Sequence, residues 1–413
     1  NISGTGSMTI DTGTTGGRLV LSGNNTMTGS REIFNGQVIL QGAGALGTAT
    51  GDNAWKFSPT SWLAVEGVEQ STLPGYIHTA SSGALALTQD TTGQLDMSHH
   101  NDMFLGAQDG KTVQYGEAGT SGKLAAWHFV EGGDGETHGQ WLLGGGGGEI
   151  VINWLLADGE GISNDLVLGN DFMGGTVTLT NVNNSFTGDI VFSDAGNVVL
   201  SFTDPRALGG AKVDLTYGRA MSGGADVPDM LSGNTLKPTA NGILLVDGDT
   251  DGEITLTRHS HLHIGANGAD VQFTGHISVN EDATYYLGGP GTLVLHNALE
   301  ANGRNDLMVD AEGFRGGAVV FNQAATITGD VTVMGYDSTL SATTGITGGD
   351  MALEVRADDA LATAASVTAK DNGTLVLGTG TTQHIGNLNI LNKGGVEMEA
   401  NTTLYVENLQ MEA

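Results

Sequence analysis

The sequence predicts an all-β fold, a right-handed single-stranded parallel β-helix with loop extensions, on the strength of three observations. Glycine is abundant and proline rare, at 67 and 6 of 413 residues, and only 15% of the residues are charged. Short Val, Leu and Ile runs alternate with Gly and Asn turns along most of the chain. The same order of strands and turns returns at distant places, which is typical of a solenoid.

The repeat is clearest in residues 18–47, which we interpret as one coil. Two β-runs, Leu19–Leu21 and Gln37–Leu40, are separated by Gly, Asn and Ser turns and end at Ala45-Leu46-Gly47. Residues 175–209 keep this order. Their elements are the strand Thr176–Leu179, an Asn-rich turn, the corner Phe186-Thr187-Gly188, the strand Val198–Leu200 and the closing Ala207-Leu208-Gly209.

Two further markers recur, and one of them is Gly-Thr-Leu-Val-Leu at Gly291–Leu295 and Gly373–Leu377. An apolar residue, Thr and Gly lead into a polar and then a β-branched residue, which suits a strand turning a corner, at Phe186–Ile190, Phe273–Ile277 and Ile327–Val331. At about 20 residues per coil, a working value for solenoid repeats, the chain would form about 20 coils. An array of antiparallel β-sandwiches is the alternative, because several Asn-Gly pairs suit hairpin turns.

We expect three regions along the chain. Residues 1–51 are the N-terminal coils, residues 52–160 are coils with long loops, and residues 161–413 are regular coils. All five tryptophans lie in the middle region, together with long polar stretches. The repeat pattern is weakest there.

Composition argues against several classes of partner and chemistry. The net charge of −31 repels phosphate backbones and anionic lipid headgroups, so we expect no nucleic-acid binding. No apolar run reaches the roughly 18–20 residues that span a bilayer, so we expect no direct membrane insertion. The chain has no cysteine, which removes disulfides, thiolate catalysis and Cys-based zinc sites.

Residues 18–47 resemble the passenger-associated repeat of AIDA-type autotransporter adhesins. The elements that carry the resemblance are the Leu-rich strand Leu19–Leu21, Ser22-Gly23-Asn24-Asn25, Thr28-Gly29, the second strand Val38–Leu40 and the closing Ala45-Leu46-Gly47. The second copy departs from the pattern, since Thr180-Asn181 replaces Ser-Gly and its turns are longer. The resemblance covers about half of the chain.

The resemblance implies a passenger domain exported by type V secretion and tethered at a Gram-negative cell surface through an outer-membrane barrel that is not in this chain. It implies an adhesin that acts in autoaggregation, biofilm growth or virulence. Its partners would be host cell-surface glycans, an extracellular-matrix protein, or another copy on a neighbouring cell.

A β-helical polysaccharide lyase or glycoside hydrolase is the alternative function. Such an enzyme needs clustered carboxylates with Arg or Lys on one face. Hydrolase motifs are missing, and the run Gly144–Gly148 lacks the Lys and Ser/Thr of a phosphate loop. We therefore expect no enzyme, no catalytic residue and no cofactor.

The tryptophans are candidate ligand contacts, because an exposed indole stacks on sugar rings or packs against a protein partner. Packing inside coils or loops is the alternative. The candidates are Trp55, Trp62, Trp127 and Trp141, whereas Trp154 lies in an apolar run and is expected in the core.

A second candidate ligand contact is formed by the acidic residues Asp247, Asp249 and Asp251 together with Arg258. Asp247, Asp249 and Asp251 begin a segment that mimics a calcium loop, but Arg258 occupies the twelfth position, where a bidentate Glu should close the shell. We expect no metal here. The default is a solvated acidic turn before the strand Ile254–Thr257.

A third candidate lies immediately beyond. His259, His261 and His263 alternate, so on a strand all three would project from one face and could contact a ligand. Three imidazoles can also bind zinc or nickel, which neighbouring Arg258 would oppose. We expect an outward polar face without metal, with Leu262 and Ile264 packed inward.

Overall fold

The computed structural model describes residues 1–413 except 14–16, 49, 132–135, 170–173, 194–197, 217–218, 224–234, 269, 311–313, 315, 336–349 and 413. The chain is nearly all β and forms a parallel β-helix of about 16 turns, which confirms the predicted fold class. Among the described residues no helix is long and apolar enough to cross a membrane. The chain divides into two compact units, Asn1–Asp214 and Leu215–Ala413.

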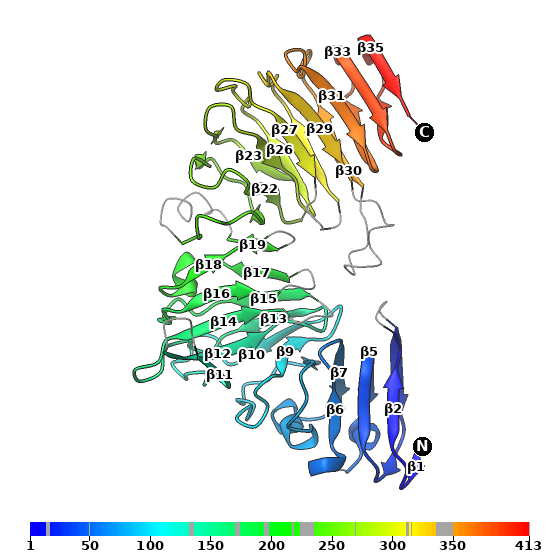
Figure 1. Cartoon of the computed structure of the whole chain (residues 1–413), viewed down its shortest axis with the longest axis vertical. Helices are drawn as coiled ribbons and strands as arrows, with labels where there is room; N and C mark the ends of the chain where they lie inside the picture. Colours follow the sequence, from blue (N-terminus) through cyan, green and yellow to red (C-terminus); the bar gives the residue numbers. More distant parts are fainter. Residues whose placement is uncertain are drawn as a thin grey trace. The chain divides into compact units, whose positions relative to one another are not determined.

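Unit 1 is built on two stacks of strands (Figure 1). In spatial order, the larger contains β18 (Lys212–Asp214), β16 (Asp189–Phe192), β14 (Asn164–Leu168), β12 (Thr137–Leu143), β9 (Phe104–Ala107), β8 (Ala84–Leu87), β7 (Ser61–Glu66), β5 (Arg31–Gln41) and β2 (Met8–Asp11). Also joined to it are β3 (Arg18–Ser22), β6 (Trp55–Phe57) and β11 (His128–Glu131). The smaller contains β10 (Thr112–Tyr115), β13 (Glu149–Ile152), β15 (Gly175–Leu179) and β17 (Val198–Phe202), and β1 (Ser3–Gly4) pairs with β4 (Thr26–Met27).

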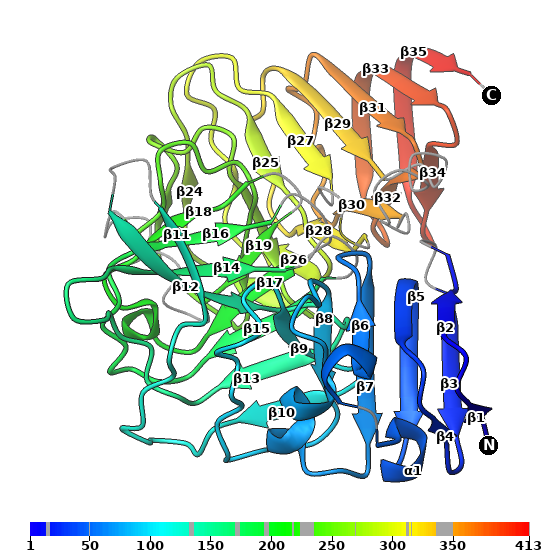
Figure 2. The same cartoon turned by 60° about the horizontal axis from the view of Figure 1, so that its bottom comes forward.

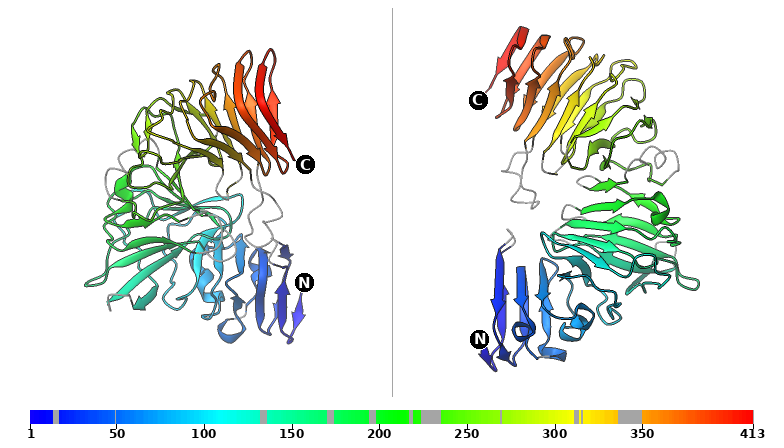
Figure 3. Two further views of the ribbon diagram at one scale, coloured as in Figure 1. Left: turned by 45° about the horizontal axis from the view of Figure 1, so that its top comes forward. Right: turned by 180° about the vertical axis from the view of Figure 1, so that it is seen from behind.

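Unit 2 repeats the plan, and its strands stack in chain order (Figure 3). One stack contains β19 (Ala220–Ser222), β20 (Ile243–Val246), β22 (His263–Ala266), β25 (Tyr285–Leu287), β27 (Leu307–Asp310), β29 (Asp330–Met334), β31 (Ser366–Lys370), β33 (Thr382–Leu391) and β35 (Thr403–Met411). The other contains β23 (Val271–Phe273), β26 (Thr292–Leu295), β28 (Ala318–Phe321), β30 (Met351–Val355), β32 (Gly373–Leu377) and β34 (Gly395–Met398), and β21 (Ile254–Thr255) pairs with β24 (Ile277–Ser278).

Helical segments are short. In the part of the chain that the structure describes they are α1 (Ala43–Leu46) and the 3₁₀ turns η1 (Gly51–Asn53), η2 (Gln70–Tyr76) and η3 (Pro205–Leu208). In the described strands the pairing is parallel except for β11 with β12, which form an antiparallel hairpin within the loop-bearing region (Figure 2). The antiparallel sandwich alternative is therefore wrong.

The expected coil length of about 20 residues is too short for most turns. In unit 1 Leu166 pairs with Ile190, and in unit 2 Tyr285 pairs with Leu307. Two turns are much longer, since Leu105 pairs with Leu143 and Asp330 pairs with Ser366. The longer turns explain why the chain makes fewer turns than predicted.

The interpretation of residues 18–47 as one coil is also corrected. Its two strands are neighbours in one sheet, because Leu19 of β3 pairs with Val38 of β5. In the second copy Thr176 of β15 likewise pairs with Val199 of β17. The repeat therefore runs from one strand to the strand above it, and its closing Ala-Leu-Gly forms α1 or η3 on the next turn.

Inward ladders of apolar side chains hold each unit together. Val38 and Leu40 of β5 are completely buried, as are Leu166 and Leu168 of β14. Alternate residues of a strand point to opposite faces, so each buried ladder comes from every second position. Burying one such side chain contributes roughly 1.5–3 kcal/mol, and this repeated gain supports the solenoid.

Candidate functional site

The four tryptophans predicted as ligand contacts are buried. Trp55, Trp62, Trp127 and Trp141 are 1%, 0%, 3% and 0% exposed. Their indoles therefore offer no surface on which a sugar ring could stack. The alternative of packing inside coils and loops holds for all four.

Three of these indoles donate a hydrogen bond to a backbone carbonyl group of another segment. Trp55 Nε1 donates to the Leu46 carbonyl at 3.0 Å, Trp127 Nε1 to the Met103 carbonyl at 3.0 Å, and Trp141 Nε1 to the Leu124 carbonyl at 3.2 Å. Buried Trp needs a partner for its single N–H group. Each indole thus fills space and fixes a turn.

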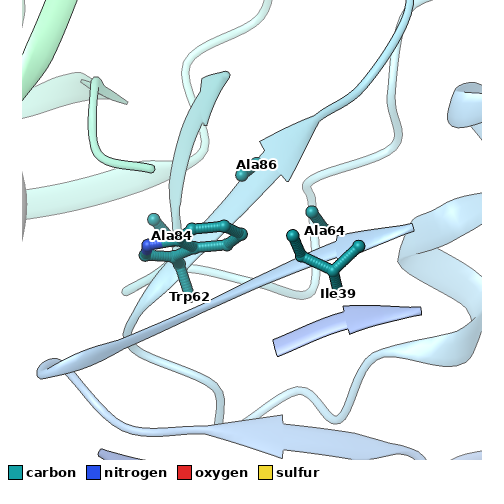
Figure 4. Packing of buried hydrophobic residues seen from close by; sticks show 5 residues of the cluster. All are labelled: Ile39, Trp62, Ala64, Ala84 and Ala86. Atoms are coloured by element: carbon teal, nitrogen blue, oxygen red, sulfur yellow. The ribbon is translucent and has the colours of Figure 1, made fainter. Parts of the chain in front are cut away.

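Trp62 instead belongs to a cluster on β7, β8 and β5. It packs with Ile39, Ala64, Ala84 and Ala86, all buried (Figure 4). Strand alternation places Leu63 on the opposite face of β7, and Leu63 is buried too. This strand is buried on both faces, a case that sequence alternation alone does not identify.

The glycine run 144–148 explains part of that burial. Gly144 to Gly147 have φ between 80° and 98°. A Cβ on Gly146 would lie 2.8 Å from Ala86 Cβ and 2.4 Å from the Ala107 carbonyl oxygen. The run therefore lies directly on β8 and β9, and its glycines serve close packing.

Trp154 corrects the expectation of a core residue, because it is only partly buried. Its ring meets Tyr115 edge-on, with centroids 6.1 Å apart. A Cβ on Gly116 or Gly122 would lie 2.9 or 2.5 Å from its indole. Trp154 thus lies over two glycines and is only partly covered.

The acidic segment is the solvated turn that was expected. Asp247, Asp249 and Asp251 are exposed, and the turn leads into β21. Asp249 Oδ1 accepts a hydrogen bond of 2.9 Å from the backbone N–H of Gln272 on β23. This carboxylate therefore joins successive coils.

The three histidines do not share a strand face. β22 begins only at His263, and the preceding residues form turns in which the His259 N–H donates to the Leu256 carbonyl. His259 and His263 are each 5% exposed, whereas His261 is exposed. The expectation that all three project from one outward face is wrong.

Burial sets the chemistry of this segment. Desolvation first, and the neighbouring Arg258 second, lower the pKa of His259. His263 Nε2 lies 3.0 Å from Asp310 Oδ1, and its ring lies 4.9 Å from that of Tyr286. Within the described residues no three His, Asp or Glu side chains come together as a metal site. Leu262 and Ile264 are completely buried, as predicted.

A buried asparagine is the recurrent polar feature that sequence reasoning did not single out. Asn25 accepts from the Ile2 N–H at 2.8 Å and donates to the Ala45 carbonyl at 3.1 Å. Asn184 accepts from the Leu156 N–H at 2.8 Å and donates to the Ala207 carbonyl at 2.7 Å. Both amides bridge the coils on either side. Asn25 and Asn184 occupy equivalent positions in the two repeat copies, and this equivalence in the sequence could have identified them.

Carboxylates bind successive coils at corners as well. An Asp Oδ1 accepts the backbone N–H of a residue one coil later, at 2.7–2.9 Å, in the pairs Asp90 with Gln114, Asp165 with Asp189, Asp306 with Asp330, and Asp358 with Thr382. Hydrogen bonds to a charged acceptor are stronger than neutral ones. Part of the acidic excess therefore has a structural role.

One cleft of about 240 Å³ lies in unit 1, between residues 94–98 and 125–127. It adjoins two features marked in the sequence, the polar stretch after β8 and Trp127. Asp96 and Ser98 supply polar groups, and Leu95 and Met97 supply apolar ones. The two sides come from segments about 30 residues apart, so spacing in the sequence does not reveal the cleft.

No family model, no curated protein and no solved structure matches the chain. The resemblance of residues 18–47 to an autotransporter repeat therefore stays a prediction.

Proposed function

We propose that the chain is a type V autotransporter passenger, displayed on a Gram-negative cell surface as an adhesin. The observation that supports this most directly is the pair of buried asparagines, Asn25 and Asn184. Two segments with the same strand-turn-strand order make the same two bridging hydrogen bonds, each ending at the carbonyl of the closing Ala-Leu-Gly. The repeat that motivates the proposal is thus a physical unit of the β-helix.

The adhesive role rests on the outer face of unit 2. Register places Thr332, Thr368, Asn389 and Gln410 in one row across β29, β31, β33 and β35. Neighbouring parallel strands lie about 4.8 Å apart, so the row presents hydroxyl and amide groups at a regular spacing. The Asn389 amide donates to Thr368 Oγ1 at 3.1 Å, which orders the row.

Such a row suits many weak contacts made together. A partner that contacts several coils gains from multivalency, since each further contact is intramolecular. The net charge of −31 favours neutral or cationic partners over anionic ones. A matrix protein, a neutral glycan or another copy that pairs through hydrogen bonds fits this surface.

Display of the chain on cells tests the proposal. We expect cells carrying it to settle, or to attach to matrix-coated wells, more than cells carrying the same anchor alone. Replacing Thr332 and Thr368 with Lys should reduce either effect, while lysines at exposed Thr28 and Thr187 of unit 1 serve as the matched control. Cells that remain dispersed and unattached would contradict the adhesin. Cleavage of a polysaccharide panel at catalytic rates would instead favour a lyase or hydrolase.

A further inference from the structure

The cleft between residues 94–98 and 125–127 has a charged rim. The Ser98 backbone N–H and Oγ both donate to Asp96 Oδ1, at 3.1 and 2.6 Å. These hydrogen bonds lower the pKa of the exposed Asp96 carboxyl, so the group is ionised at neutral pH. Both hydrogen bonds end at Oδ1, so the second carboxylate oxygen of Asp96, Oδ2, accepts neither of them.

The walls of the cleft are apolar and held in place. Leu95, Met97 and Trp127 are 3%, 4% and 3% exposed. The Leu95 N–H donates to the Tyr115 hydroxyl at 3.0 Å, and Trp127 Nε1 donates to the Met103 carbonyl. Because buried groups anchor both sides, the cleft is formed before a ligand arrives, which reduces the entropy that binding loses.

The volume limits what can enter. At about 240 Å³ the cleft is smaller than the roughly 300–1,000 Å³ of pockets for drug-sized ligands. It matches a single side chain or small group. An aliphatic stem ending in a cation complements apolar walls with a carboxylate at the rim.

The surrounding charge favours the same class of ligand. The chain carries a net charge of −31, which raises the local concentration of cations and repels anions. The nearby Lys123 directs its ammonium group to the Asp158 carbonyl. The positive charge of Lys123 is therefore held at the backbone of Asp158.

We propose that this cleft receives a lysine or arginine side chain from a basic segment of the partner protein. The inference rests on the proposed function, because it names the partner chemistry at one contact point of the adhesin. A partner protein is then recognised in two ways, through a cation at this cleft and through polar contacts along the coils.

Titration of the full chain with acetyl-Gly-Lys-Gly-amide tests the proposal, followed by saturation-transfer NMR. We expect binding that acetyl-Gly-Gln-Gly-amide does not show. Asp96→Asn keeps the shape and the acceptor for Ser98 but removes the charge, and should weaken binding about fivefold, as for a partly exposed ion pair. Asp109→Asn removes the same charge from an exposed turn beyond β9 and should change binding by less than about twofold.

Blocking the cleft gives a second readout. Ala125→Trp should abolish binding, with an unchanged circular dichroism spectrum and Tm as the check on folding. If this variant misfolds, Asp96→Asn and Asp109→Asn still decide the matter. Equal weakening by the two Asn variants would show general attraction to an acidic surface and would overturn the proposal, as would binding of both peptides alike.

The two proposals fail in different ways. If displayed cells still attach to matrix but the lysine peptide does not bind, the cleft proposal is contradicted and the adhesin proposal stands. If the peptide binds specifically at Asp96 but the displayed chain causes neither settling nor attachment, the adhesin proposal is contradicted. The cleft is then a cation-binding site without an adhesive role.

Discussion

The loop-bearing region fixes its turns with tryptophan side chains in addition to bridging asparagines of the kind found in the regular coils. In the repeats at residues 18–47 and 175–209, a buried Asn donates to one coil and accepts from another. Within residues 52–160, Trp127 and Trp141 fill the space under longer turns, and each donates its indole N–H to a loop carbonyl. A turn of constant length leaves two backbone groups for an amide to bridge. An inserted turn leaves a space that a bulky ring fills.

Removing an indole should therefore have the largest effect. Trp141 is completely buried and packs edge-on against Phe186, with centroids 5.6 Å apart. Trp141→Ala removes this packing and leaves the Leu124 carbonyl without its donor, so we expect unfolding to become easier by about 3–5 kcal/mol. The shift in urea midpoint measures the loss.

Trp154→Ala is the matched control for Trp141. Its indole is partly exposed, so the substitution should cost clearly less than Trp141→Ala. Equal losses of stability in the two variants would show that the burial of an indole does not determine how much it stabilises the fold. Hydrogen exchange at residues 124–130 should rise only in Trp141→Ala.

The bridging amides should come next in size. Asn184→Ala leaves the Leu156 N–H and the Ala207 carbonyl unpaired in a buried place, at a cost of about 2–3 kcal/mol. The neighbouring Asn183 is exposed, so Asn183→Ala should change stability by less than about 0.5 kcal/mol. Thermal denaturation of the two variants gives the comparison.

The first repeat copy provides an independent test of the same bridge. Asn25→Ala should resemble Asn184→Ala, and exposed Asn24→Ala should resemble Asn183→Ala. A neutral Asn25→Ala would mean that the two copies share a sequence pattern without sharing its energetics.

Local patterning predicted the regular coils and failed for the inserted loops. Leu262 and Ile264 were assigned inward from alternation, which depends only on neighbours in the chain. Trp127 is held instead by Met103, whose carbonyl accepts its indole N–H, and it lies across the cleft from residues 94–98. Sequence texture there is polar, and it suggested exposed indoles.

The candidate site was predictable only in part. The exposed turn at Asp247–Asp251 follows from its composition. The face shared by His259, His261 and His263 did not form, because a turn ends before β22 and alternation does not apply within it. The cleft at Asp96 required two segments to meet, and no local rule gives that contact.

Buried histidines make both regions sensitive to acid. Desolvation is the main cause that lowers the pKa of His100 in the loop-bearing region and of His259 in the regular coils. The unfolded chain, with histidine pKa near 6.5, then binds protons that the folded chain does not. Stability is full above this pH and falls as the pH decreases from about 7 toward the lowered folded values.

Replacement with Gln tests the sign of this effect. His100→Gln and His259→Gln should each flatten the dependence of Tm on pH between about 5 and 7. Their neighbours His99 and His261 are exposed, so the same change at those positions should leave the dependence nearly as it is. A steeper dependence in either buried variant would contradict the assignment.

The corner carboxylates should give the smallest effect, and they test whether acidic turns act by hydrogen bonding or by holding an ion. Asp249→Ala removes the acceptor for the Gln272 N–H at an exposed corner, so we expect a loss of about 0.5 kcal/mol. Asp251→Ala removes an equal charge from the same exposed turn and should cost less. Because the Asp249 bond already joins the two coils, Tm should be the same in calcium as in a chelator. A rise in Tm with calcium that both variants abolish would show a bound ion, and this acidic turn would then differ in kind from the Asp90, Asp165, Asp306 and Asp358 corners.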